Sequence, residues 1–158
     1  MIPVRIVQGD ATSPQASGPK VIVHCCNDMG GWGKGFVLAL SRRWPEPERD
    51  YRRWHRERAG NDFALGAARL IPVRPDTWVA NVIGQHGTRR GSAGPPVRYE
   101  AIARGLVTVG DEAVRLGASV HMPRIGCGLA GGRWERVEPL VVAALSDRDV
   151  PVTVYDFG

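Results

Sequence analysis

The chain is poor in cysteine and lysine, and it has no long apolar run. Its three cysteines are Cys25, Cys26 and Cys127. The count is odd, two are adjacent, and no CxxC spacing accompanies them, so a disulfide framework and a zinc site are both disfavoured. We expect reduced, mostly buried thiols, no metal and no cofactor. No apolar stretch approaches the ~18 residues of a membrane span. Residues 1–7 lack the features of a signal peptide. We therefore expect a cytoplasmic protein without membrane contact.

Length and composition favour one globular domain. The chain has 158 residues, of which 43% are hydrophobic and 23% charged, values ordinary for a folded domain. We therefore expect a single domain over residues 1–158, and a monomer.

Charge is the unusual property of the composition. The net charge is +5, and only Lys20 and Lys34 among the 21 basic residues are lysines. Such a balance favours a polyanionic partner or an anionic ligand, or it reflects a solvated surface with an arginine bias. Residues 42–58 contain seven arginines and four acids. This segment is interpreted as a solvated helix face with i, i+4 ion pairs, or as a nucleic-acid surface.

Hydrophobic patterning predicts alternating strands and helices. Runs rich in Val and Ile predict strands, and apolar residues at i, i+3 and i+4 predict helices. The alternation indicates an α/β layered domain. The turn at 74–77 is short, so it predicts an antiparallel pair and a mixed sheet. The expected strands are 4–8, 21–24, 67–73, 78–83, 119–122 and 152–155, and the expected helices lie within 36–44, 46–59, 102–116 and 134–145.

Glycine-rich segments follow three of these strands, at 9–12, 27–35 and 125–132. Ligands of open α/β sheets bind at the carboxyl ends of the strands, and glycines there allow backbone N–H groups to approach phosphate oxygens. The pattern is neither a Walker A motif nor the dinucleotide fingerprint. A further loop, 84–96, has four glycines and two prolines, and such loops are often functional.

These segments together resemble an ADP-ribose-binding macrodomain. The resemblance rests on Gly9-Asp10-Ala11-Thr12, on His24-Cys25-Cys26-Asn27 with its glycine-rich continuation, and on Met122-Pro123-Arg124-Ile125-Gly126-Cys127-Gly128-Leu129 followed by Trp134-Glu135. They look most like the branch of terminal ADP-ribose protein glycohydrolase and the DNA ADP-ribosyl glycohydrolase antitoxins. The resemblance implies a three-layer α/β/α macrodomain with a mixed sheet of about six strands.

The resemblance also implies a role for each matching segment. Asp10 would accept a hydrogen bond from the adenine amino group, although Asp also serves as a turn or helix cap. Tyr155 or Phe157 would pack on the adenine, and Asn27 would face the distal ribose. Lys34 would attract phosphate at the rim of the first loop. The implied ADP-ribose contacts are Gly9, Asp10, Ala11, Asn27, Gly30, Gly31, Trp32, Gly33, Lys34, Gly35, Ile125, Gly126, Cys127, Gly128, Leu129, Tyr155 and Phe157.

Two of these side chains have more than one possible role. The Trp32 side chain would cover the distal ribose as a lid, or it would fold back onto the domain. Cys127 stands near a helix N-terminus, which can lower a thiol pKa, but the family uses this position for packing beneath the loop.

The implied catalytic machinery differs from that of the branch. The lysine that the branch uses after strand four falls at Gln85, or one residue away at His86, and its aspartate falls at Ala130. Gln85 could orient a water or the ribose, and His86 could act as a base. The catalytic candidates are therefore Gln85, His86 and Asn27, with Gln85 best placed, while the diphosphate itself could also accept the proton of a water.

The expected function is hydrolysis of ADP-ribose from a modified protein or DNA, by cleavage at C1″ of the distal ribose. The alternatives are a reader module that binds ADP-ribose without catalysis, and a phosphatase acting on ADP-ribose 1″-phosphate. The expected partners are ADP-ribose, ADP-ribosylated protein or DNA, and nucleic acid at the arginine-rich surface.

Overall fold

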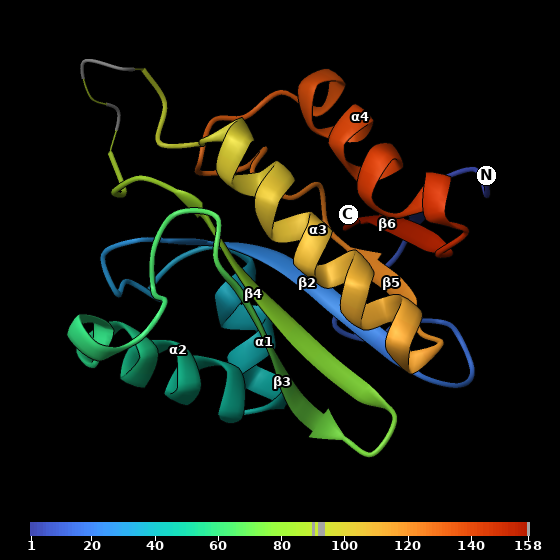
Figure 1. Ribbon diagram of the computed structural model, residues 1–158, viewed down its shortest axis with the longest axis horizontal. Coiled ribbons are helices and arrows are strands. Elements are labelled where there is room, and N and C mark those ends of the chain that lie inside the picture. The colour runs from blue at the N-terminus through green and yellow to red at the C-terminus, as the bar shows by residue number, and fades with distance from the viewer. Residues whose placement is uncertain (90, 92–93, 158) are drawn as a thin grey trace.

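A computed structural model describes residues 1–89, 91 and 94–157; parts of the 84–96 loop and the last residue lie outside them. Six strands and four helices follow one another along the described chain (Figure 1). They are β1 (Arg5–Gln8), β2 (Lys20–Asn27), α1 (Phe36–Arg43), α2 (Glu46–Arg56), β3 (Ala68–Arg74), β4 (Thr77–Gln85), α3 (Tyr99–Leu116), β5 (Ser119–Met122), α4 (Trp134–Ala144) and β6 (Val152–Asp156). Two single 3₁₀ turns lie at Arg58–Gly60 and Ser146–Arg148.

The strands form one mixed sheet in the order β1-β6-β5-β2-β4-β3. In this order, each pair of neighbours from β1 through β6, β5 and β2 to β4 is parallel. The last strand, β3, pairs antiparallel with β4. The antiparallel pair predicted from the short turn is therefore confirmed. Because five strands are parallel, the carboxyl ends of β1, β6, β5, β2 and β4 meet at one edge of the sheet.

Helices cover both faces of the sheet, as the three-layer prediction requires. Figure 1 shows α3 and α4 on one side and α1 and α2 on the other. Under α3 and α4 the core is mostly aliphatic. Under α1 and α2 it is largely aromatic. Its aromatic members are Trp32, Trp44, Tyr51, Trp54 and Phe63.

Helix boundaries follow local chemistry. In α2, Pro47, Tyr51 and Trp54 recur at i, i+4 and i+7 and form the buried face, as expected for an amphipathic helix. Helix α3 ends at Gly117, which adopts φ 63° and ψ 35°, a left-handed conformation that glycine adopts without steric cost.

Strands β2 and β4 extend further toward the carboxyl edge than the apolar pattern predicts. Asn27 pairs with Gln85 beyond a register shift, because Gly84 is an extra residue in β4 between Ile83 and Gln85. A Cβ atom on Gly84 would lie 2.7 Å from Cγ1 of Ile102 and 2.8 Å from Sγ of Cys25. Only glycine fits this bulge, which places polar residues at the end of both central strands.

No helix in the described part of the chain is long and apolar enough to cross a membrane. Among the same residues, no cluster of three His, Cys, Asp or Glu side chains is positioned to hold a metal ion.

Two buried histidines should make the stability of the fold depend on pH. Burial lowers the pKa of His24 to about 4, although its hydrogen bond with Asn81 acts to raise that pKa. Burial and then the charges of Lys20 and Arg5 lower the pKa of His121 to about 4. In the unfolded chain both bind a proton below about pH 6.5, while the folded protein excludes it down to about pH 4.

We therefore expect the free energy of unfolding to fall as the pH drops from about 6.5 to 4, by up to roughly 3 kcal/mol for each histidine. Urea unfolding at a series of pH values measures this slope, and His121→Gln should flatten part of it. A free energy of unfolding that stays constant or rises over this interval would contradict the assignment.

Candidate active site

The two larger glycine-rich segments lie next to each other at the carboxyl edge. A Cβ atom on Gly35, in the loop after β2, would lie 3.4 Å from Cδ1 of Leu129, in the loop after β5. Added Cβ atoms on Gly33 and Gly128 would meet no atom within 4 Å. The backbone at these two glycines is therefore open to an incoming group, as two loops that grip a phosphate chain would require.

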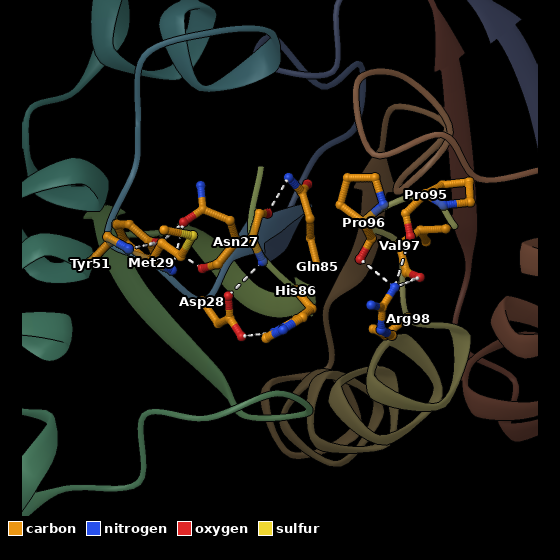
Figure 2. A network of polar contacts seen from close by, with 12 residues as sticks. Asn27, Asp28, Met29, Tyr51, Gln85, His86, Pro95, Pro96, Val97 and Arg98 are labelled. Atoms are coloured by element: carbon orange, nitrogen blue, oxygen red, sulfur yellow. Dashed lines mark hydrogen bonds and ion pairs between the residues drawn. The ribbon is translucent and has the colours of Figure 1, made fainter. Parts of the chain in front are cut away.

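Asn27 organises the first of these loops (Figure 2). Its Oδ1 accepts hydrogen bonds from the backbone N–H groups of Met29 (2.9 Å) and Gly31 (3.1 Å), and its Nδ2 donates to the Gly31 carbonyl (2.9 Å). The Tyr51 hydroxyl donates to the Asn27 carbonyl (2.5 Å) and accepts from the N–H of Gly30 (3.1 Å). The second N–H of the Asn27 amide has no partner in the described part of the chain, so most of the hydrogen bonds of this side chain are made within the loop.

The Trp32 side chain folds back onto the domain, so the lid alternative is wrong. It is 4% exposed in the aromatic core, and its indole N–H donates to Oγ of Ser41 at 2.8 Å. Only the backbone of Trp32 is left to contact a ligand. Lys34 is exposed at the rim of the same loop, where it was expected to attract phosphate.

Gln85 and His86 lie beside this loop, at the end of β4 (Figure 2). Nδ1 of His86 is 2.7 Å from Oδ2 of Asp28, and Oδ1 of Asp28 accepts the Gly87 N–H at 2.7 Å. Nε2 of Gln85 donates to the Gly87 carbonyl at 2.9 Å, which leaves its Oε1 as an acceptor. His86 is largely exposed, at 62% of its side chain. The carboxylate thus orients the imidazole through Nδ1, and Nε2 of His86 has no hydrogen-bond partner among the described residues.

The sequence pattern indicated no role for Asp28, which stands within a glycine-rich segment. The available signal was a carboxylate directly after a buried strand, at the edge where ligands of α/β sheets bind. The arrangement of a carboxylate, a histidine and an amide is one that can position and deprotonate a water.

Arg124 anchors the second loop. Its guanidinium donates to both carboxylate oxygens of Asp156, at 2.7 and 2.9 Å, and lies 5.4 Å from the ring centre of Trp134. Gly126 has φ 73° and packs against Ile102. Burial raises the pKa of the Cys127 thiol, and its Sγ donates to the Ile125 carbonyl. Cys127 therefore supports the loop by packing and is not an activated thiolate.

The Asp10 carboxylate lies at the other end of the edge, after β1. It accepts hydrogen bonds from the backbone N–H and hydroxyl of Thr12, at 2.8 and 2.7 Å, and its second oxygen lies 3.7 Å from Nη2 of Arg43. Partial burial raises the pKa of Asp10, but the Thr12 hydrogen bonds and the Arg43 charge outweigh it and leave that pKa below its usual value. Asp10 both shapes the turn and remains an ionised acceptor.

Of the two aromatic candidates at this end, only Phe157 presents a free ring. Tyr155 is 3% exposed, and its hydroxyl is bound to Nδ1 of His121 (2.7 Å) and to the N–H of Gln15 (3.2 Å). Its ring lies beneath Gly9. The expectation that Tyr155 could stack on an adenine is therefore wrong. Phe157 is 85% exposed and follows β6, the neighbour of β1.

Comparison with known proteins identifies the family. No model of a protein family matches the chain. The solved structure of a macrodomain protein from Streptomyces coelicolor is 60% identical, with a TM-score of 0.89, over 99% of this chain and 100% of that one. An ADP-ribose 1″-phosphate phosphatase from Chaetomium globosum is 30% identical over 96% of this chain and 91% of its own length. Chromodomain-helicase-DNA-binding protein 1-like from Mus musculus is 34% identical over 98% of this chain, which spans only 18% of that protein. The fold, the paired glycine loops and these likenesses show that the chain belongs to the macrodomain family.

Proposed function

We propose that the protein binds ADP-ribose along the carboxyl edge of its sheet and hydrolyses the bond between C1″ of the distal ribose and a modified macromolecule. The observation that carries the hydrolytic part is the contact of Asp28 with His86, beside Gln85 and the first glycine loop. The family relation supports the binding part.

Sheet order supports one orientation of the ligand. Along the edge, Asp10 follows β1, Phe157 follows β6, Gly126–Leu129 follow β5, Gly30–Gly35 follow β2, and Gln85 ends β4. From β1 to β4 this spans four strand spacings, or roughly 19 Å. Adenine lies at Asp10 and Phe157, the diphosphate at the open glycines of both loops, and the distal ribose at Gln85.

The proposed reaction needs one water. With Nδ1–H of His86 donated to Asp28, Nε2 accepts a proton from the water as its oxygen attacks C1″. The bond from C1″ to the leaving atom breaks, its electron pair stays with the leaving group, and His86 returns the proton there. Oε1 of Gln85 accepts a hydrogen bond from the water or from a ribose hydroxyl and so fixes the approach. The products are free ADP-ribose and the unmodified macromolecule.

A second candidate reaction has a specific observation behind it. The Chaetomium globosum relative is named an ADP-ribose 1″-phosphate phosphatase, and the same site would place a 1″-phosphate near His86. Release of inorganic phosphate from ADP-ribose 1″-phosphate, without release of ADP-ribose from macromolecules, would favour this candidate.

The direct test uses two substrates, an ADP-ribosylated protein and an ADP-ribosylated DNA, with free ADP-ribose quantified by chromatography. We expect release from at least one of them. Tight binding of ADP-ribose with no release from either substrate would overturn the hydrolase and leave the reader alternative.

The adenine end can be tested separately. Asp10→Ala should weaken ADP-ribose binding by about 1.5–3 kcal/mol, the range for a hydrogen bond to a charged group. Calorimetry with free ADP-ribose measures the loss. Asp147→Ala, at an exposed carboxylate in the 3₁₀ turn Ser146–Arg148, is a control for a general loss of negative charge. Unchanged affinity in Asp10→Ala would remove Asp10 from the binding site.

A further inference from the structure

Helix α2 presents four exposed arginines on one side: Arg49, Arg52, Arg53 and Arg56, called here the arginine stripe. Their spacing is i, i+3, i+4 and i+7, so they form a continuous row. The acids of the same helix, Glu46, Glu48 and Asp50, are only partly exposed. The outward side of α2 is therefore cationic even though the helix contains acids.

Two members of the stripe keep their charge unpaired. Arg52 pairs with Glu48 at 2.9 Å and Arg53 with Asp50 at 3.0 Å. Within the described chain, Arg49 and Arg56 have no ion-pair partner. A solvated helix face would pair such charges at i, i+4, and here the pairing is incomplete.

The stripe adjoins the proposed catalytic end. Nη1 of Arg52 donates to the Gly30 carbonyl at 3.1 Å. The His55 ring fills the space over Gly30. Met29, in the same loop, is 61% exposed and lies against Gly87, next to His86. A polymer attached at C1″ of the distal ribose would thus leave the site over Met29 and α2.

We propose that the arginine stripe docks the phosphodiester backbone of the nucleic acid whose ADP-ribose the site removes. The stripe spans ~10.5 Å along the helix axis, so it is long enough to contact more than one phosphate of a nucleic-acid strand. Arginine suits this role because its planar guanidinium binds phosphate oxygens in pairs. The proposal rests on the proposed function for its purpose, but docking itself does not require catalysis.

The test measures binding of a short, unmodified single-stranded DNA by fluorescence anisotropy at several salt concentrations. In R49Q/R56Q, removal of two phosphate contacts should lower the slope of log affinity against log salt by about 1.4, at about 0.7 for each contact. The matched control is R104Q/R115Q on α3, which makes the same change of charge on the opposite face of the sheet. Each single variant, R49Q and R56Q, should show about half the effect.

The outcomes separate this inference from the proposed function. Free ADP-ribose should bind R49Q/R56Q with unchanged affinity, and this also verifies folding. Equal slopes for the wild type and R49Q/R56Q, or equal losses in both double variants, would overturn the stripe. So would competition by poly-glutamate of matched charge with the same dependence on Arg49 and Arg56, which would assign the surface to acidic protein. Release of ADP-ribose without binding of DNA would contradict the docking role of the arginine stripe and support the hydrolase. Binding of DNA that depends on the stripe, without release of ADP-ribose, would support the docking role and contradict the hydrolase.

Discussion

Gly128→Glu should abolish ADP-ribose binding while the protein stays folded. The added Cβ atom meets no neighbour within 4 Å, and φ at Gly128 is not positive, so the substitution places no strain on the backbone. The carboxylate would occupy the space between the two glycine loops and repel the diphosphate. Calorimetry with free ADP-ribose measures the loss, and thermal unfolding verifies the fold.

Gly60→Glu is the matched control. Gly60 also has open space around its Cα, and it lies in the 3₁₀ turn Arg58–Gly60, outside both glycine-rich loops. It makes the same change of charge and volume, and ADP-ribose should bind it as it binds the wild type. A folded Gly128→Glu protein with normal affinity would refute the two-loop site. Gly126 does not serve this test, because its positive φ and its packing on Ile102 would confound binding with stability.

The second large effect is on turnover. Gln85→Ala should reduce release of ADP-ribose by about a hundredfold or more, the usual result of losing one well-placed hydrogen bond in a transition state. His86→Ala should reduce it by roughly 10²–10⁴, the contribution of a positioned base. Affinity for free ADP-ribose should fall far less in both, because the adenine and diphosphate contacts remain.

The variant Asp28→Asn tests whether His86 acts as the base or takes no part in the reaction. If His86 accepts the proton at Nε2, the amide removes the carboxylate that orients the ring and should reproduce most of the His86→Ala loss. The double variant of Asp28→Asn and His86→Ala should be little worse than either single one, because the two act as a unit. Full activity in His86→Ala with a large loss in Gln85→Ala would instead assign the step to Gln85 alone, with the substrate diphosphate as the base. Full activity in both variants would remove this loop from the mechanism.

Much of the fold was predictable because its elements are locally consistent. Apolar runs, most of them bounded by glycine, proline or aspartate, marked every strand, and the short turn at 74–77 indicated the antiparallel edge. The glycine segments followed strands, and this was enough to predict where they would meet. The same local signals could not show that Tyr155 lies beneath Gly9, because burial of an aromatic ring depends on contacts between segments distant in sequence.

Side-chain roles at the site depended on such contacts as well. Asn27 looked like a ligand for ribose, but most of its hydrogen bonds organise the loop that follows it. Asp28 gained its role only through His86, 58 residues away. The choice between Gln85 and His86 could not be made from the pattern, because a β-bulge changes which residue points to which side of a strand.

That bulge has a consequence for how this edge tolerates insertions and deletions. The extra residue at Gly84 shifts the alternation of β4 by one position just before it ends. Deleting Gly84 would restore regular pairing and exchange the directions of the two residues that follow, without changing any side chain. In a relative without the bulge, the reactive side chain would have to stand one position earlier or later in the sequence to occupy the place that it has here. Strand length, and not only residue identity, therefore determines which chemistry this scaffold can present.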